Sequence, residues 1–96
     1  MAFAIETIRG WRGTVLRALY TADPDWLFES TLKRVLHSQA GCPPDDELRH
    51  VVHYLRGRGL IESEDKGLPG SPRFQHRITA KGIEMATNGC NDPEIW

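Results

Sequence analysis

Residues 44–60 constrain the fold of this chain most, because they have the pattern of one amphipathic helix with a defined start and end. At about 100° per residue, the apolar side chains fall on one side of such a helix and the polar ones on the other. The apolar side consists of Leu48, Val51, Val52 and Leu55, and the polar side of Asp46, Arg49, His50 and His53. We therefore expect one face to pack in a core and the other to meet solvent or a partner.

Both ends of this helix carry residues that suit them. Pro44 fits the first helical position, since the N–H that it lacks would have no partner there. The carboxylates of residues 45–47 place negative charge at the positive end of the helix dipole. At the other end, Gly59 can take the left-handed conformation that ends a helix, next to Arg56 and Arg58.

The composition excludes several classes of protein. The 96 residues are enough for one domain with one core, and no apolar run approaches the roughly 18 residues that cross a membrane. The first ten residues lack the basic and apolar regions of a secretory signal, so we expect a cytoplasmic location, with Cys42 and Cys90 as free thiols. Because the net charge is only −1, binding to nucleic acid would require one basic face.

The rest of the chain predicts a definite order of elements. Helical spacing of apolar residues indicates helices at 5–20 and 31–38, the second with Ser30 as its N-cap, and a last helix at 80–87 capped by Thr79. Residues 26–28 are either a brief strand or an apolar plug. Strands at 60–64 and 73–79 flank a Gly- and Pro-rich loop and predict a β-hairpin. Arg12 falls awkwardly within the first apolar stripe, so its stem packs, or it pairs with a carboxylate, or the helix begins near Gly10.

Two segments carry a resemblance to a known family. Residues 48–62 (LRHVVHYLRGRGLIE) resemble a recognition helix running into a wing, and Thr79 with Gly82 is similar to the entry from a wing into a last helix. On these residues the chain resembles the winged helix-turn-helix domains of the MarR, ArsR and PadR-like regulators, and more distantly small winged-helix proteins of Mu-like prophages. The resemblance implies a mostly α, α+β fold with a small antiparallel β-hairpin. It implies a single domain over residues 1–96, with a core at about 10–88 and a C-terminal tail at 89–96.

The resemblance also implies a surface for double-stranded DNA. In such domains the exposed face of the third helix enters the major groove, and the hairpin reaches a flanking phosphate or the minor groove. The matching residues here are Arg49, His50, His53 and Arg56 on the helix and Lys66, Arg73 and Arg77 on the wing. Residues 45–47 oppose this reading, since three carboxylates at the leading end of the helix repel phosphates. They either stabilise the helix start or indicate a protein partner.

Other kinds of site have weaker support. Cys42, His50 and His53 offer sulfur and nitrogen ligands that zinc accepts, but no further ligand lies nearby in the usual spacing, so we expect no metal and no other cofactor. The sequence has no phosphate-cradling glycine loop and no nucleophile motif, so we expect no enzyme.

Apolar residues near both ends of the chain predict a homodimer. A minimal core need not cover Ile5, Ile8 and Trp11 at one end or Ile95 and Trp96 at the other, and exposed aromatic groups often mark an interface. The alternative is that they fold back onto the same core. The sequence thus favours a DNA-binding regulator of bacterial or phage type. A winged-helix module for protein–protein contact is the alternative, and a basic stripe unbroken by residues 45–47 would favour DNA.

Overall fold

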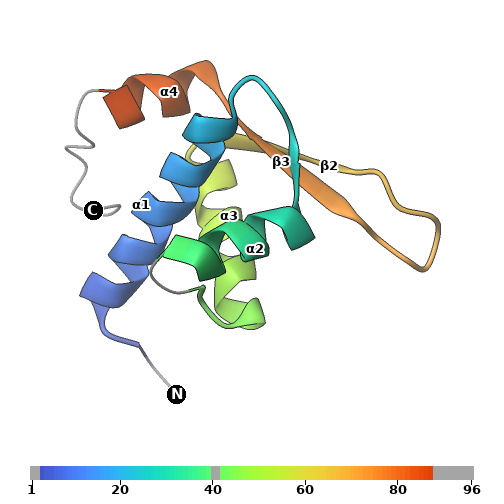
Figure 1. The fold of residues 1–96 in the computed structure, drawn as a ribbon, viewed down its shortest axis with the longest axis horizontal. Helices are drawn as coiled ribbons and strands as arrows, with labels where there is room; N and C mark the ends of the chain where they lie inside the picture. The colour runs from blue at the N-terminus through green and yellow to red at the C-terminus, as the bar shows by residue number, and fades with distance from the viewer. Residues whose placement is uncertain (1–2, 40–41, 88–96) are drawn as a thin grey trace.

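The computed structural model describes residues 3–39 and 42–87 and confirms the expected order of elements (Figure 1). These residues form the following helices and strands: α1 (Ile5–Ala22), β1 (Leu27–Phe28), α2 (Glu29–Gln39), α3 (Asp45–Gly57), β2 (Ile61–Asp65), β3 (Phe74–Ile78) and α4 (Ala80–Thr87). The strands pair antiparallel in the order β1-β3-β2. The α+β fold, with two helices leading into a hairpin, is that of a winged helix-turn-helix.

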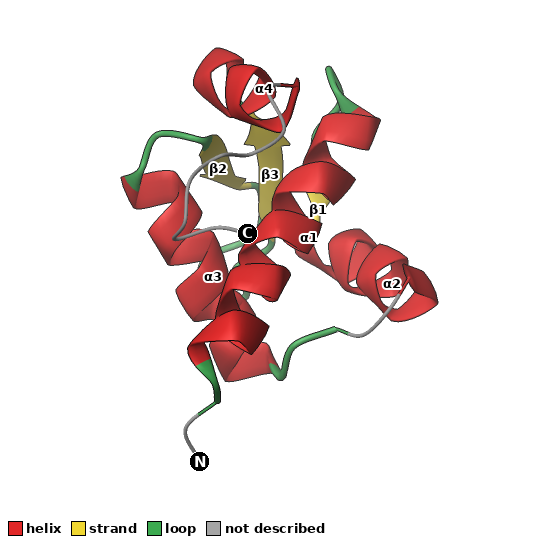
Figure 2. Cartoon of the chain, turned by 90° about the vertical axis from the view of Figure 1, so that its left-hand side faces the viewer, coloured by secondary structure: helices red, strands yellow, loops and turns green. Residues whose placement is uncertain are grey.

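Helix α1 is the centre of the packing. It contacts α2, α3, β3 and α4, and Figure 2 shows it in front of the sheet with α2 and α3 on its two sides. The core side chains that are at most 1% exposed come from α1, α2, α3 and the residue before β2; they include Leu16, Leu19, Leu32, Leu36, Leu48, Leu55 and Leu60. The hairpin of β2 and β3, the wing, extends away from this helical body (Figure 1).

The sheet has one face on the core and one face outward. Strand partners Ile61 and Ile78 are buried on the inner face, and His76 lies opposite Ser63 on the same face. Because side chains alternate along a strand, Arg77 and its cross-strand partner Glu62 lie on the outer face. Residues 27–28 form a strand paired with β3, so the first of the two alternatives for this apolar segment holds.

Two predicted helix starts are wrong, by two residues for α2 and by one residue for α3. Pro44 is the N-cap of α3 with extended backbone angles (φ −54°, ψ 154°), and the first helical residue is Asp45. Ser30 lies inside α2 and does not cap it, because β1 runs directly into the helix at Glu29 with no residue between them. Helix α1 begins at Ile5 and not near Gly10.

The awkward position of Arg12 is resolved by an aromatic ring. Its guanidinium carbon lies 3.7 Å from the centroid of the Tyr54 ring in α3, so the stem packs between helices and the charge rests on a π face. A guanidinium stacked on Tyr54 was not among the three alternatives for Arg12, and of those three the helix start near Gly10 is wrong.

The junction from α3 to the wing is fixed by hydrogen bonds that the sequence pattern anticipated. Gly59 has φ +75°, and its N–H donates to the Arg56 carbonyl (2.9 Å), while the Leu60 N–H donates to the Leu55 carbonyl (3.0 Å). This pair of bonds is the Schellman motif. The Thr79 hydroxyl donates to the Gly59 carbonyl (2.6 Å) and accepts from the Gly82 N–H (3.1 Å), which confirms it as the cap of α4.

Candidate nucleic-acid interface

A groove of about 760 Å³ lies between the first turns of α2, the outward face of α3 and the start of β3. Four permanently charged cations line it, and they are Lys33 of α2, Arg49 and Arg56 of α3, and Arg73 just before β3. Three histidines also line it, namely His50, His53 and His76. Among the described residues that line the groove, Glu29 is the only acidic one. The groove is therefore strongly basic, although the whole chain is nearly neutral.

The α3 residues that the sequence assigned to DNA contact share one exposed face. Arg49, His50, His53 and Arg56 follow one another at intervals of one or three residues, which places them on adjoining turns of the helix. The His50 side chain is 76% exposed. Arg56 Nη2 lies 3.5 Å from His53 Nδ1, and because arginine can only donate, this histidine nitrogen accepts.

The acidic start of α3 lies beside the groove and does not line it. The Asp45 carboxylate is 3.1 Å from Lys33 Nζ, and a Glu47 oxygen is 3.9 Å from His50 Nδ1. Asp45 and Glu47 therefore each lie close to a basic side chain of the same protein. The predicted clash between residues 45–47 and a bound polyanion is reduced but persists at Asp46, which is exposed.

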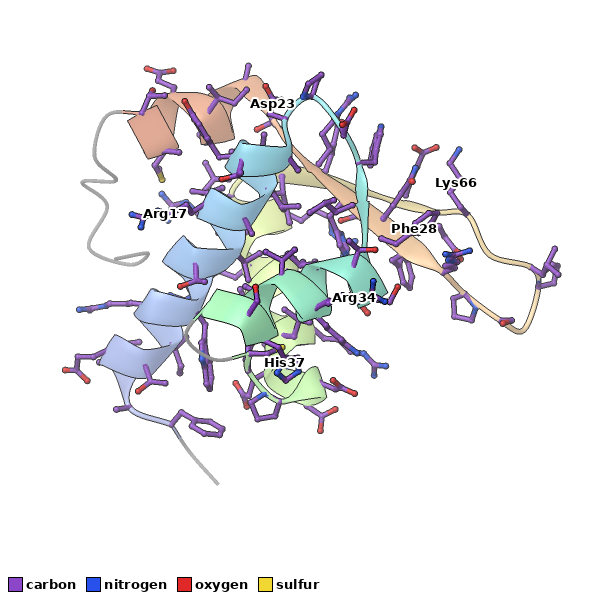
Figure 3. All side chains as sticks on the ribbon, viewed as in Figure 1. Arg17, Asp23, Phe28, Arg34, His37 and Lys66 are labelled. Atoms are coloured by element: carbon purple, nitrogen blue, oxygen red, sulfur yellow. The ribbon has the colours of Figure 1, made fainter. Side chains whose placement is uncertain are left out.

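The three basic residues assigned to the wing lie at three different places in the structure. Arg73 lines the groove, with its guanidinium carbon 3.9 Å from the centroid of the Phe28 ring. Lys66 projects from the hairpin (Figure 3) and pairs with Glu64 at 3.1 Å. Arg77 pairs with Glu62 on the outer face of the sheet, where it also stacks over the Trp26 ring at 4.6 Å. The structure thus joins Arg73 to the α3 face and leaves Lys66 and Arg77 outside the groove.

A buried polar network at the groove escaped the sequence reasoning. His76 is 2% exposed, with Nδ1 2.7 Å from Ser63 Oγ and Nε2 3.3 Å from a Glu29 oxygen. Burial lowers the pKa of His76 below its ordinary value of 6.5, Glu29 acts in the opposite direction, and Arg56 lowers it further. In the neutral ring, Nε2–H donates to Glu29 and Nδ1 accepts from Ser63. The one available signal was the inward position of His76 in the strand alternation.

The wing is held at its base by one carboxylate. Asp65 Oδ1 accepts from the Gly67 N–H (2.9 Å) and from the Arg73 N–H (3.0 Å), and these two bonds lower the pKa of Asp65 below its ordinary value of 3.8. At the tip, the Ser71 N–H donates to the Leu68 carbonyl (2.9 Å) across a turn in which Gly70 has φ +82°. Residues 67–72 carry no charge, and Leu68 is 76% exposed.

We expect Asp65→Ala to loosen the base of the wing. The amide protons of Gly67 and Arg73 lose their acceptor, so their hydrogen exchange should become several-fold faster while the core amides of α1 keep their rates. Glu64→Ala removes a neighbouring exposed carboxylate that accepts no backbone bond and serves as the control. In the unchanged protein the same loosening should appear as the pH falls through the native pKa of Asp65. Equal exchange rates in the two variants would contradict this role of Asp65.

The residues proposed for a dimer interface have different surroundings. Ile5 is 44% exposed, whereas Ile8 and Trp11 are partly buried. The Trp11 ring packs against the core and meets the Phe3 ring edge-on, with centroids 4.9 Å apart. Trp11 therefore folds back onto its own chain, which was the alternative, while Ile5 stays available. Ile95 and Trp96 lie outside the described residues.

The other sequence expectations concern metals and membranes. Within residues 3–39 and 42–87, no three or more His, Cys, Asp and Glu side chains form a group that could hold a metal ion. Cys42 packs against the core, and burial raises the pKa of its thiol. No helix in the same ranges is both long and apolar enough to span a membrane. Cys90 lies outside the described residues.

Comparison with known proteins identifies the fold and nothing finer. No family model matches the sequence, and no curated protein matches it. A transcriptional regulator from Clostridium thermocellum has a similar structure, with a TM-score of 0.65 and 20% identity over 93% of this chain and 85% of that one. The circadian clock associated protein Pex from Anabaena has a TM-score of 0.61 and 16% identity over 84% of this chain and 74% of its own. The likeness is one of winged-helix architecture.

Proposed function

We propose that this chain binds double-stranded DNA through the groove between α2, α3 and β3, and that it acts as a transcriptional regulator. The observation that carries the proposal is the convergence of Lys33, Arg49, Arg56 and Arg73 on one groove. Phosphate neutralisation supplies most of the affinity of proteins for DNA, and it depends on how closely cations are gathered, not on net charge. Two solved structures of the same architecture, one of them a transcriptional regulator, agree with this reading.

These cations are expected to have two different roles in DNA binding. An α-helix fits the major groove of B-DNA, and Arg49, on the exposed face of α3, can make a bidentate contact to guanine or hold a phosphate. Lys33 comes from α2 and Arg73 from the start of β3, and both would hold flanking phosphates. Arg49 is thus the residue expected to contribute to sequence preference, while Lys33 and Arg73 set the position of the protein on the duplex.

The proposal includes finer points that rest on sequence and exposure. From residues 48–62 and 77–86 we place the chain with the MarR, ArsR and PadR-like regulators of bacterial or phage type, working in the cytoplasm. A single winged helix touches few phosphates, and Ile5 is an exposed apolar residue on α1, so we propose a homodimer. Sedimentation of the unchanged protein and of Ile5→Asp should show a dimer in the first case only.

A protein partner is the second candidate, and one observation favours it. The uncharged wing tip presents Leu68, which is 76% exposed, and Phe74 is 40% exposed nearer the sheet. Exposed apolar side chains at the end of a projecting hairpin are more typical of a protein contact than of a phosphate contact. In that case Asp45 and Asp46 would meet basic groups of the partner.

The test is binding to a fluorescent duplex, measured by anisotropy at several salt concentrations. We expect affinity to fall steeply with salt, and Arg49→Ala and Arg73→Ala each to weaken binding by about tenfold at low salt. Arg73→Ala, which removes a phosphate contact, should also reduce the slope of log K against log salt by about 1. Arg34→Ala is the matched control, because Arg34 is exposed on α2 but does not line the groove (Figure 3).

Two outcomes would count against this assignment. Absence of binding at low salt would exclude DNA as the partner and favour the protein-contact function. Binding that Arg34→Ala weakens as much as Arg49→Ala and Arg73→Ala would show that charge anywhere on the surface suffices, and that the groove is not the site.

A further inference from the structure

Most of the histidines of this chain lie at the groove. The chain has four histidines, and three of them, His50, His53 and His76, line the groove. The fourth, His37, is exposed near the end of α2 and is not among the lining residues (Figure 3). Imidazole is the side chain that changes charge between pH 5 and 8, so the groove holds a variable charge besides its permanent one.

His53 lies next to a cation on the same face of α3. Its Nδ1 faces Arg56 Nη2 at 3.5 Å, and only an unprotonated nitrogen can accept from a guanidinium. A protonated His53 would instead place two positive groups of the same α3 face against each other. A phosphate oxygen lying between them would reverse this effect, since it accepts from both groups and favours the charged imidazole.

His50 has mixed surroundings on the same face. A Glu47 oxygen lies 3.9 Å from its Nδ1, and Arg49 is its neighbour in sequence. Because its side chain is 76% exposed, water screens both influences strongly, and the ring is open to a ligand in the groove. A phosphate within hydrogen-bonding distance would therefore be the strongest influence on its protonation.

His76 has a different role from His50 and His53, because its side chain is buried and cannot contact a ligand in the groove directly. Glu29 of α2, Ser63 of β2 and Arg56 of α3 are the polar or charged groups that interact with it. Its Nε2–H holds the Glu29 carboxylate, which is the one acid among the described lining residues. His76 thus restrains the carboxylate that lines the groove, and His50 and His53 remain as the exposed histidines of the lining.

We propose that the groove takes up protons when it binds DNA, with His50 and His53 becoming phosphate-binding cations, so that affinity rises as the pH falls from 8 to 6. This inference rests on the proposed DNA-binding function. Linkage requires the converse as well, because a ligand that favours protonation is itself bound more tightly by the protonated protein. Each proton gained adds one cation against the phosphates, so the salt slope should steepen by up to about 0.9 for each histidine.

The experiment measures duplex binding at pH 6, 7 and 8 at constant ionic strength. We expect affinity to rise about tenfold or more from pH 8 to pH 6, with a steeper salt slope at pH 6. The double variant His50→Gln/His53→Gln should show less than about a twofold change in affinity between pH 8 and pH 6. His37→Gln removes a histidine outside the groove and should keep the full pH dependence.

An NMR titration of the imidazole signals supplies the second readout. The signals of His50 and His53 should titrate at a higher pH in the presence of the duplex than in its absence, while that of His37 should not move. Binding that is independent of pH, or a pH dependence that the double variant retains, would overturn the inference and leave the DNA-binding function standing. Absence of binding at all three pH values would instead overturn the DNA-binding function.

Discussion

Gly82→Ala is expected to destabilise the folded chain by about 3 kcal/mol, one of the largest effects of any single methyl group in this domain. A Cβ at this position would lie 2.2 Å from the Leu60 carbonyl oxygen and 2.7 Å from Ile78 Cγ1. The first of these neighbours is backbone at the Schellman end of α3, which cannot move without breaking the junction to β2. We expect urea denaturation followed by circular dichroism to show the loss.

Gly10→Ala is the matched control for this substitution. Gly10 also lies within a helix, but a Cβ there would meet nothing within 4 Å outside the helix backbone. Alanine should therefore stabilise the protein by about 0.5–1 kcal/mol through helix propensity alone. If both variants shifted the urea midpoint in the same direction, the close approach of α4 to Leu60 would not be the reason that position 82 is glycine.

His76→Ala is expected to cost about 2 kcal/mol, because it leaves Glu29 and Ser63 without their buried partner and opens a gap between the wing and α2. The pH dependence of stability is the sharper test. Burial lowers the pKa of His76 below 6.5 in the folded state, so the unfolded chain binds the proton more readily. The contribution is therefore complete above about pH 6.5 and is lost as the pH falls toward the lower native pKa.

His76→Gln separates this effect from general acid sensitivity. Glutamine can still donate to Glu29 and accept from Ser63 but does not titrate, so the fall in the free energy of unfolding below pH 6.5 should become shallower. His37→Gln, which changes an exposed histidine, should leave the wild-type profile unchanged. Unfolding curves at pH 5.5, 6.5 and 7.5 measure both. A profile that His76→Gln leaves as steep as before would show that other groups cause the acid sensitivity.

Where local pattern carries the information, the sequence predicted the structure closely. The expected last helix, residues 80–87, has the bounds of α4, and Gly59 and Thr79 take the roles of helix stop and cap. These features depend on hydrophobic spacing and on the conformational preferences of single residues, which act over a few positions. The starts of α2 and α3 were misplaced because caps depend on what precedes the helix, and here β1 runs straight into α2.

Only some of the residues that line the groove could be predicted from the sequence. The α3 face follows from helical spacing, so Arg49, His50, His53 and Arg56 were named correctly as one exposed face. Lys33 was missed because it reaches the groove from another helix, where its spacing indicates nothing but solvent.

Two further contacts could not be predicted from the sequence for a similar reason. Glu29 and His76 are 47 residues apart, and no local pattern indicates that they meet. Arg77 looked like a wing cation, but its strand position turns it toward Glu62 and Trp26.

The sequence alone therefore determined the helices, the hairpin and the polar face of α3, because spacing and single-residue preferences act locally. The tertiary structure decided where the charge gathers. It brought Lys33 and Arg73 to the groove beside that face, kept residues 45–47 out of the lining, and buried His76 against Glu29. These placements depend on how α1 packs the helices against the sheet, since distant side chains become neighbours only when the core closes.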